Sequence, residues 1–212
     1  MSVAGEVAED PDAKVNAEGT AFTVNGEAWV ATSRVVLVMH KPVDFEVSRK
    51  PQYHPSVHSL LPEPFNMRGV QAAGRLDADT TGMLLLSDDG ALIHALTSPK
   101  RNVHKTYEVR LVHPCTPELV HALKSGVQLH DEPGPIAAVH CEATGADSLR
   151  IVLREGKYHQ VKRMIGAGGN RVLSLHRAAI GAFGLPPELQ PGQWREVSEA
   201  ELASVWNEPA KP

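Results

Sequence analysis

The densest polar cluster of this 212-residue chain is GRLDADTTG, residues 74–82. Its aspartates allow three interpretations: a calcium site, a structural turn or a catalytic site. Asp77, Asp79 and Asp88 stand at positions 1, 3 and 12 of a calcium-binding EF-hand loop, but the surrounding glycines and the apolar run that follows do not predict the two flanking helices of such a loop. The cluster could instead be a structural turn whose carboxylates bind backbone amides. Alternatively, one of its carboxylates is catalytic and is held beside an arginine on a turn between strands.

Basic residues concentrate in two later segments. The whole chain has a formal net charge of -4 and a pI near 6.2, which argues on average against a nucleic-acid partner. However, residues 149–177 contain seven Lys and Arg against one acid, Glu155, and residues 100–110 contain four against Glu108. Such clustering can present one cationic surface to a phosphate backbone, although a merely solvated face is the alternative.

The longer basic segment includes a predicted amphipathic helix that begins after Tyr158. At 100° per residue, its apolar side chains fall on one side and its basic side chains on the other. The apolar side consists of Val161, Met164 and Ile165, and the basic side consists of His159, Lys162 and Arg163. We therefore expect this helix to pack on the core while it presents cations on its other side.

The remaining pattern predicts short strands interrupted irregularly by helices. Asn25-Gly26 is a strong hairpin signal within Thr20–Val30. A strand over Val35–Met39 is expected to end at Lys41-Pro42, and further strands are expected over 83–86, 104–112, 136–141, 149–154 and 171–175. Short helices are expected over 57–61, 90–96, 116–126 and 198–206. This order indicates an α+β fold with a mixed, mainly antiparallel sheet in two lobes and with flanking helices.

Composition and termini predict one soluble folded domain with short tails. Residues 1–18 are acidic and aperiodic, which is typical of a flexible tail. Residues 19–207 are expected to form two lobes around a central cleft, and residues 208–212 a second tail. No apolar run approaches the roughly 20 residues of a membrane helix, and the acidic N-terminus does not match a signal peptide. We expect a cytoplasmic protein with no membrane partner, and Cys115 and Cys141 are too isolated for a disulfide framework or a thiolate metal site.

Three segments together resemble one enzyme family. They are GRLDADTTGMLLLSDDG (residues 74–90), Lys105-Thr106-Tyr107, and EGKYHQVKRMIGAGGNRVLSLHRAAIG (residues 155–181). In this order they are similar to signature segments of pseudouridine synthases, in the branch that modifies ribosomal RNA. With its connecting stretches the resemblance covers roughly residues 35–205. It implies that 19–207 is the catalytic domain of an isomerase that needs no cofactor and no metal.

The resemblance also implies roles for individual residues. Asp77 resembles the catalytic carboxylate of the family, which acts as a nucleophile or as a base, and Lys162 resembles its basic partner. Tyr107 resembles the aromatic residue that packs against the target base, and Leu175 resembles the apolar floor of the site. Arg75 resembles the arginine that enters the RNA stack where the target nucleotide was. Asp79 is expected only to structure the loop. The basic residues expected to face the RNA are Lys105, Arg154, His159, Arg163 and Arg177.

A finer resemblance concerns the substrate. GVQLHDEPGPIAA (residues 126–138) and residues 159–177 resemble most the members that act on small-subunit rRNA. This implies that a monomer modifies one uridine of 16S rRNA, uridine 516, in a small-subunit assembly intermediate. Alternatives are a 23S rRNA enzyme, an inactive RNA-binding assembly factor, and a carboxylate-dependent glycosidase, which would need a second carboxylate. Because only about 30 residues precede the core, the N-terminal S4-like RNA-binding module common in this branch is expected to be absent or truncated.

Overall fold

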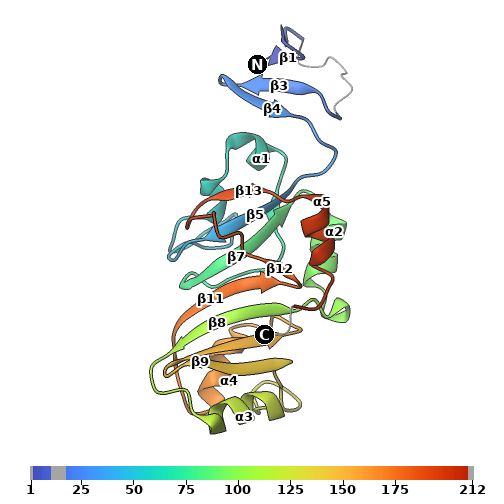
Figure 1. Cartoon of the computed structure of the whole chain (residues 1–212). Coiled ribbons are helices and arrows are strands. Elements are labelled where there is room, and N and C mark those ends of the chain that lie inside the picture. Colours follow the sequence, from blue (N-terminus) through green and yellow to red (C-terminus); the bar gives the residue numbers. More distant parts are fainter. Residues whose placement is uncertain (1, 11–17, 210–212) are drawn as a thin grey trace. The chain divides into compact units, whose positions relative to one another are not determined.

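The computed structural model describes residues 2–10 and 18–209, and it divides the chain into two compact units between Val35 and Val36 (Figure 1). The first unit contains a four-stranded antiparallel sheet in the order β2-β1-β3-β4. Its strands are Ser2–Val3 (β1), Glu6–Val7 (β2), Ala21–Val24 (β3) and Glu27–Val30 (β4). The hairpin expected at Asn25-Gly26 is confirmed, with φ values of 51° and 84° at these two residues, as a type I′ turn requires.

A flexible tail was predicted over residues 1–18, but the structure shows two short strands there, β1 and β2. Ser2 pairs with Thr23 across β1 and β3, and their hydroxyl oxygens lie 2.7 Å apart. The edge of β3 would otherwise leave backbone N–H and C=O groups unpaired, and the polar N-terminal segment pairs with them. The hairpin therefore belongs to the first unit, and the second unit begins at Val36 rather than at residue 19. Residues 11–17 of the predicted tail lie outside the described residues.

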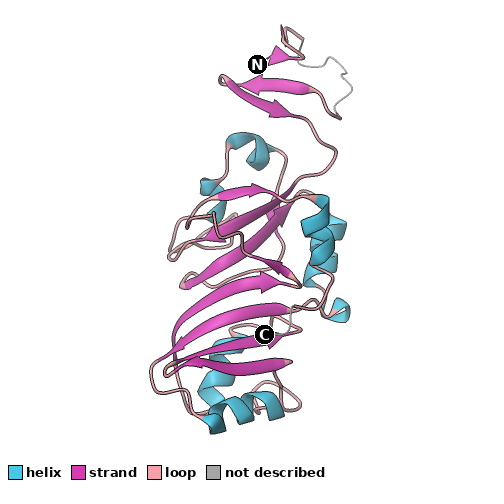
Figure 2. Ribbon diagram, in the orientation of Figure 1, coloured by secondary structure: helices cyan, strands magenta, loops and turns pink. Residues whose placement is uncertain are grey.

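A nine-stranded sheet dominates the second unit (Figure 2). Its order is β13-β5-β7-β11-β8-β10-β9, with β12 beside β11 and β6 beside β7. The strands are Val36–Lys41 (β5), Gln71–Ala72 (β6), Thr80–Ser87 (β7), Lys105–Leu111 (β8), His140–Gly145 (β9), Ser148–Leu153 (β10), Val172–Ile180 (β11), Phe183–Gly184 (β12) and Trp194–Glu196 (β13). β7 and β11 pair in parallel, and the other named pairs are antiparallel. The expected α+β fold with a mixed, mainly antiparallel sheet is confirmed.

Helices flank both ends of this sheet (Figure 1). They are Glu63–Met67 (α1), Gly90–Thr97 (α2), Pro117–Ser125 (α3), Gln160–Ala167 (α4) and Glu199–Ser204 (α5), with 3-10 turns at Val57–Leu60 and Pro99–Arg101. Residues of α2 and α5 share one buried cluster with β5 and β7, whereas α3 contacts α4 and β9. The two predicted lobes are therefore the two ends of one continuous sheet. The C-terminal tail is described only to residue 209.

A close approach of β7 and β11 fixes the loop that carries Asp77. Gly82 has a φ of 107°, and a Cβ atom there would overlap the backbone of Arg177, so only glycine fits. Thr80 pairs with Leu175 in the parallel register. Because the Thr80 N–H also donates to the Asp77 carbonyl oxygen at 3.1 Å, the loop is held at the start of β7, near Leu175.

Two strand boundaries differ from the sequence pattern. Ile136 exchanges backbone hydrogen bonds of 2.9 and 3.0 Å with Val127, so β9 begins only at His140. The strand expected over Val35–Met39 extends to Lys41, which is the last residue of β5 and is fully buried. Both differences arise from tertiary contacts that local patterns do not encode.

Candidate active site

An ion pair joins the loop before β7 to helix α4. The Asp77 Oδ2 atom accepts a hydrogen bond of 2.8 Å from the Lys162 Nζ atom, and the same ammonium donates to Asp79 Oδ1 at 2.7 Å. Lys162 lies on the side of α4 opposite the buried Val161 and Met164, as the helical periodicity indicates. Asp79, expected only to structure the loop, is thus a second partner of Lys162.

His159 contacts the other oxygen of the same carboxylate. Its Nε2 atom lies 3.2 Å from Asp77 Oδ1. His159 is the N-cap residue of α4 and has a φ of 48°, which is uncommon for a residue other than glycine. Because His159 and Lys162 are three positions apart at the start of a helix, they lie on one face. Each oxygen of Asp77 therefore faces one nitrogen.

A pocket of about 60 Å³ adjoins Asp77. Arg75 lines it from the loop before β7, Tyr107 and Leu175 from the sheet, and His159 from the turn before α4. Tyr107 pairs with Arg177 across β8 and β11. Leu175 lies two residues before Arg177 in β11, so strand alternation places it on the same face of the sheet as Arg177 and Tyr107. The structure therefore brings most of the expected catalytic and base-binding residues into one pocket.

Lys162 and Asp79 each stabilise the charged form of the other. Burial by itself would lower the pKa of Lys162, but hydrogen bonds to Asp77 and Asp79 outweigh burial and raise it. Burial would raise the pKa of Asp79, but the hydrogen bond and charge of Lys162 outweigh it and lower the pKa. The ammonium is consequently fixed beside Asp77 at neutral pH. A carboxylate oriented in this way, at the wall of a pocket, can act as a nucleophile or as a base.

Lys41 lies beneath the loop that carries Asp77, a position that its local sequence does not indicate. It is 0% exposed, and its Nζ atom donates to the carbonyl oxygens of Pro42, Ala78 and Thr80 at 2.8, 3.0 and 2.9 Å. Burial lowers the pKa of Lys41 to about 8, although nearby aspartates act against the shift. From the sequence alone, a lysine at the end of an apolar strand is expected to lie at the surface. The structure shows that Lys41 instead binds the backbone carbonyl groups on both sides of Asp79.

A second pocket, of about 90 Å³, adjoins the first and shares Arg75 and Tyr107 with it. Lys105 and Arg177 line this second pocket. Arg177 is 4% exposed and donates from Nε to the Met83 carbonyl oxygen at 2.7 Å. Burial, and then the charge of Arg177, lower the pKa of Lys105 to about 8. Arg177, one of the cations expected to face the RNA, lies on the same face of the sheet as Tyr107 and is nearly buried there.

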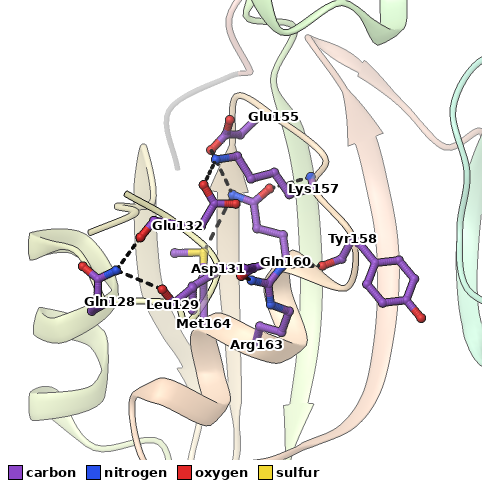
Figure 3. A network of polar contacts seen from close by, with 10 residues as sticks. All are labelled: Gln128, Leu129, Asp131, Glu132, Glu155, Lys157, Tyr158, Gln160, Arg163 and Met164. Carbon is purple, nitrogen blue, oxygen red and sulfur yellow. Dashed lines mark hydrogen bonds and ion pairs between the residues drawn. The ribbon is translucent and has the colours of Figure 1, made fainter. Parts of the chain in front are cut away.

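The segment before α4 is held by a network of polar contacts (Figure 3). Lys157 Nζ lies 2.5 Å from Glu132 Oε2, and Arg163 pairs with Asp131. The Gln160 side chain accepts a hydrogen bond of 2.9 Å from the Lys157 backbone N–H. Two cations of the predicted basic surface thus already have acidic partners.

Arg154 is not brought to the Asp77 pocket. It lines a separate pocket with residues of the 132–139 loop, and its Nε atom lies 3.4 Å from His104 Nε2. Among the residues that the structure describes, no group of three or more His, Cys, Asp or Glu side chains is placed to hold a metal ion. No helix in residues 2–10 and 18–209 is long and apolar enough to cross a membrane.

Three comparisons relate this architecture to known proteins. Residues 35–167 match the family model described as RNA pseudouridylate synthase. "Ribosomal small subunit pseudouridine synthase A" of Vibrio parahaemolyticus is 39% identical over 207 residues, which are 97% of this chain and 88% of the relative. The protein of that name from Escherichia coli is 41% identical over 79% of this chain and 72% of the relative. A crystal structure of a pseudouridylate synthase covers 96% of this chain and 87% of its own, with a TM-score of 0.77 and 30% identity.

Proposed function

Because the chain belongs to the RNA pseudouridylate synthase family, we propose that it converts one uridine of small-subunit rRNA to pseudouridine, and that this nucleotide is uridine 516 of 16S rRNA. Relatives of this chain that carry the small-subunit name support the choice of RNA, since one of them aligns with 97% of this chain. The observation that carries the proposal is the Asp77–Lys162 pair at a pocket lined by Tyr107.

The proposed reaction relocates the uracil ring and leaves the composition of the nucleotide unchanged. The bond between N1 and the ribose C1′ breaks, the base turns, and C5 bonds to C1′. C5 loses a proton and N1 gains one. This isomerisation requires a group that forms a bond or moves a proton at the nucleoside, and walls that retain the detached base. Asp77 supplies the group, while Tyr107 and Leu175 supply the walls.

Asp77 has two routes open to it. As a nucleophile, one of its oxygens bonds to the ribose or the base and is later released. As a base, it takes a ribose proton to give a glycal-like intermediate and later returns it. In both routes the Lys162 ammonium stabilises the negative charge of the Asp77 carboxylate, and His159 helps to fix the orientation of that carboxylate. The same residues therefore serve either mechanism.

The target nucleotide has to leave the RNA stack to reach Asp77, at a cost of a few kcal/mol. Packing of the uracil against Tyr107 offsets about 1–3 kcal/mol of this cost. Arg75 enters the gap that the nucleotide leaves in the stack. Since Arg75 lines the pocket, its movement toward the RNA also enlarges the space for the incoming base.

The rest of the RNA binds through cations around the pocket. Arg163 and His159 contact phosphates or bases at the rim, where phosphates compete with Asp131 for Arg163, and Arg154 contacts the RNA from its separate pocket beside the 132–139 loop. Lys105 and Arg177 lie deeper and make the second pocket electropositive. The partner is 16S rRNA in a small-subunit assembly intermediate, bound in the cytoplasm by a monomer that carries no cofactor.

The function is tested by chemical mapping of pseudouridine at nucleotide resolution. The chain is incubated separately with protein-free 16S rRNA, with assembling small subunits and with 23S rRNA. We expect a new pseudouridine at uridine 516, strongest in the assembling particle. Modification of 23S rRNA alone would overturn the proposed substrate, and the lack of pseudouridine in all three samples would overturn the activity.

A further inference from the structure

Tyr158 is an exposed aromatic side chain beside the Asp77 pocket. It is 74% exposed, and its sequence neighbours Lys157 and His159 both line the pocket. Its ring stacks on the His159 ring with centroids 3.8 Å apart and planes 20° apart. Since the Nε2 atom of His159 also contacts Asp77, the His159 ring links the exposed Tyr158 ring to the carboxylate of Asp77.

The backbone around Tyr158 is fixed although its ring is exposed (Figure 3). Arg163 Nη1 donates to the Tyr158 carbonyl oxygen at 3.0 Å, and the Lys157 N–H donates to the buried Gln160 side chain at 2.9 Å. In Figure 3 the Tyr158 ring projects away from these contacts. A ring on a segment held in this way loses little further conformational freedom when a ligand covers it.

We propose that Tyr158 is a stacking platform for an unpaired RNA base next to the target uridine, an inference that rests on the proposed function. Turning one nucleotide out of a stack exposes the faces of its neighbours, and unpaired bases in RNA stack on exposed aromatic rings. Arg163, whose guanidinium donates to the Tyr158 carbonyl oxygen, suits a phosphate of such a nucleotide, which would compete with Asp131 for it. Because every base has a π-face, the platform binds without strong preference for the base.

The test uses a fragment of 16S rRNA that spans the target uridine and carries the fluorescent base 2-aminopurine at either flanking position. Binding is measured with the wild-type chain and with Tyr158→Ala, Tyr158→Phe and, as a control, Tyr53→Ala. Tyr53 is equally suitable as a surface tyrosine because it is 88% exposed and lines neither of the two pockets around Tyr107.

We expect one flanking position to be quenched on binding to the wild-type chain. Tyr158→Ala should lose this quenching and bind RNA about 5- to 150-fold more weakly, with KM raised and kcat within about twofold. Tyr158→Phe and Tyr53→Ala should behave as wild type. Because the side chain is exposed, the thermal midpoint of Tyr158→Ala should not change.

The outcomes separate the platform from the function. If the wild-type chain forms pseudouridine and Tyr158→Ala matches it in quenching and affinity, the platform is wrong and the function stands. A loss in Tyr158→Phe equal to that in Tyr158→Ala would assign the contact to the hydroxyl group and overturn stacking. If the wild-type chain forms no pseudouridine on any rRNA sample, the function itself fails.

Discussion

The Lys162 ammonium lies 2.8 Å from Asp77 and 2.7 Å from Asp79, carboxylates that are 85 and 83 positions away in the sequence. The two aspartates stand before β7, whereas Lys162 stands on α4. The pair therefore forms only when both ends of the sheet are assembled, so that the chemistry of the site depends on the whole second unit.

Replacing Lys162 with Met should impair turnover more than RNA binding. The variant removes the charge that faces Asp77 but leaves the other cations of the rim in place. We expect kcat to fall about 100-fold, in the range found when a single electrostatic contact to reacting groups is removed. The rRNA Kd should stay within about threefold, and Lys124→Met, at an exposed position on α3, should change neither quantity. A loss of affinity with unchanged kcat would contradict the proposed pairing.

Gly82 should tolerate no side chain. Gly82→Ala places a Cβ atom on the Arg177 backbone at a φ of 107°, and we expect the free energy of unfolding to fall by at least about 3 kcal/mol. Gly166→Ala is the matched control, because that helical position is open and alanine favours a helix by about 1 kcal/mol over glycine. Denaturant titration of both variants measures the difference, and equal stabilities would show that β7 and β11 are not so closely apposed.

Lys41 should stabilise the loop that carries Asp77. Lys41→Met leaves three carbonyl oxygens without their shared donor, and we expect a loss of roughly 2–4 kcal/mol in the free energy of unfolding. The exposed Lys50→Met is the control and should change stability by less than about 0.5 kcal/mol. If Lys41→Met unfolds at the same denaturant concentration as wild type, the loop is held by other contacts.

Stability should rise with pH through the titration of Lys105. Its pKa is about 8 in the folded chain against an ordinary value of 10.5, so between these pH values the unfolded chain binds more protons than the folded one. Raising the pH from 8 to 10 should therefore increase the stability of wild type relative to Lys105→Gln by on the order of 1 kcal/mol. Lys41, whose pKa is also about 8, adds a similar slope to both proteins. Urea titrations at the two pH values check this, and parallel changes in the two proteins would contradict it.

Local patterns were sufficient wherever a segment's own chemistry decided its structure. The Asn25-Gly26 turn is confirmed, and so is the capping box of Ser198 and Glu201 at α5. The periodicity of α4 placed Lys162 on the side that meets Asp77. These features depend on contacts within a few residues, which the sequence displays directly.

Long-range contacts account for what the patterns did not predict. Nothing local distinguishes Lys41 from a surface lysine, since its three acceptors lie partly on a loop 37 and more positions away. The pairing of Ser2 with Thr23 likewise follows from an available strand edge rather than from hydrophobic alternation. For His159, the left-handed backbone that brings its ring to Asp77 has no signal in helical periodicity.

If the carboxylate of Asp77 performs the isomerisation, Asp77→Asn should abolish it, because the amide keeps the shape of the side chain but removes its charge. Pseudouridine is mapped in assembling small subunits after incubation with wild type, with Asp77→Asn and with Asp147→Asn, a control at an exposed turn. We predict that wild type and Asp147→Asn form pseudouridine at one uridine, whereas Asp77→Asn binds the RNA but forms none. An equal pseudouridine signal from Asp77→Asn and wild type would show that the carboxylate of Asp77 does not perform the isomerisation.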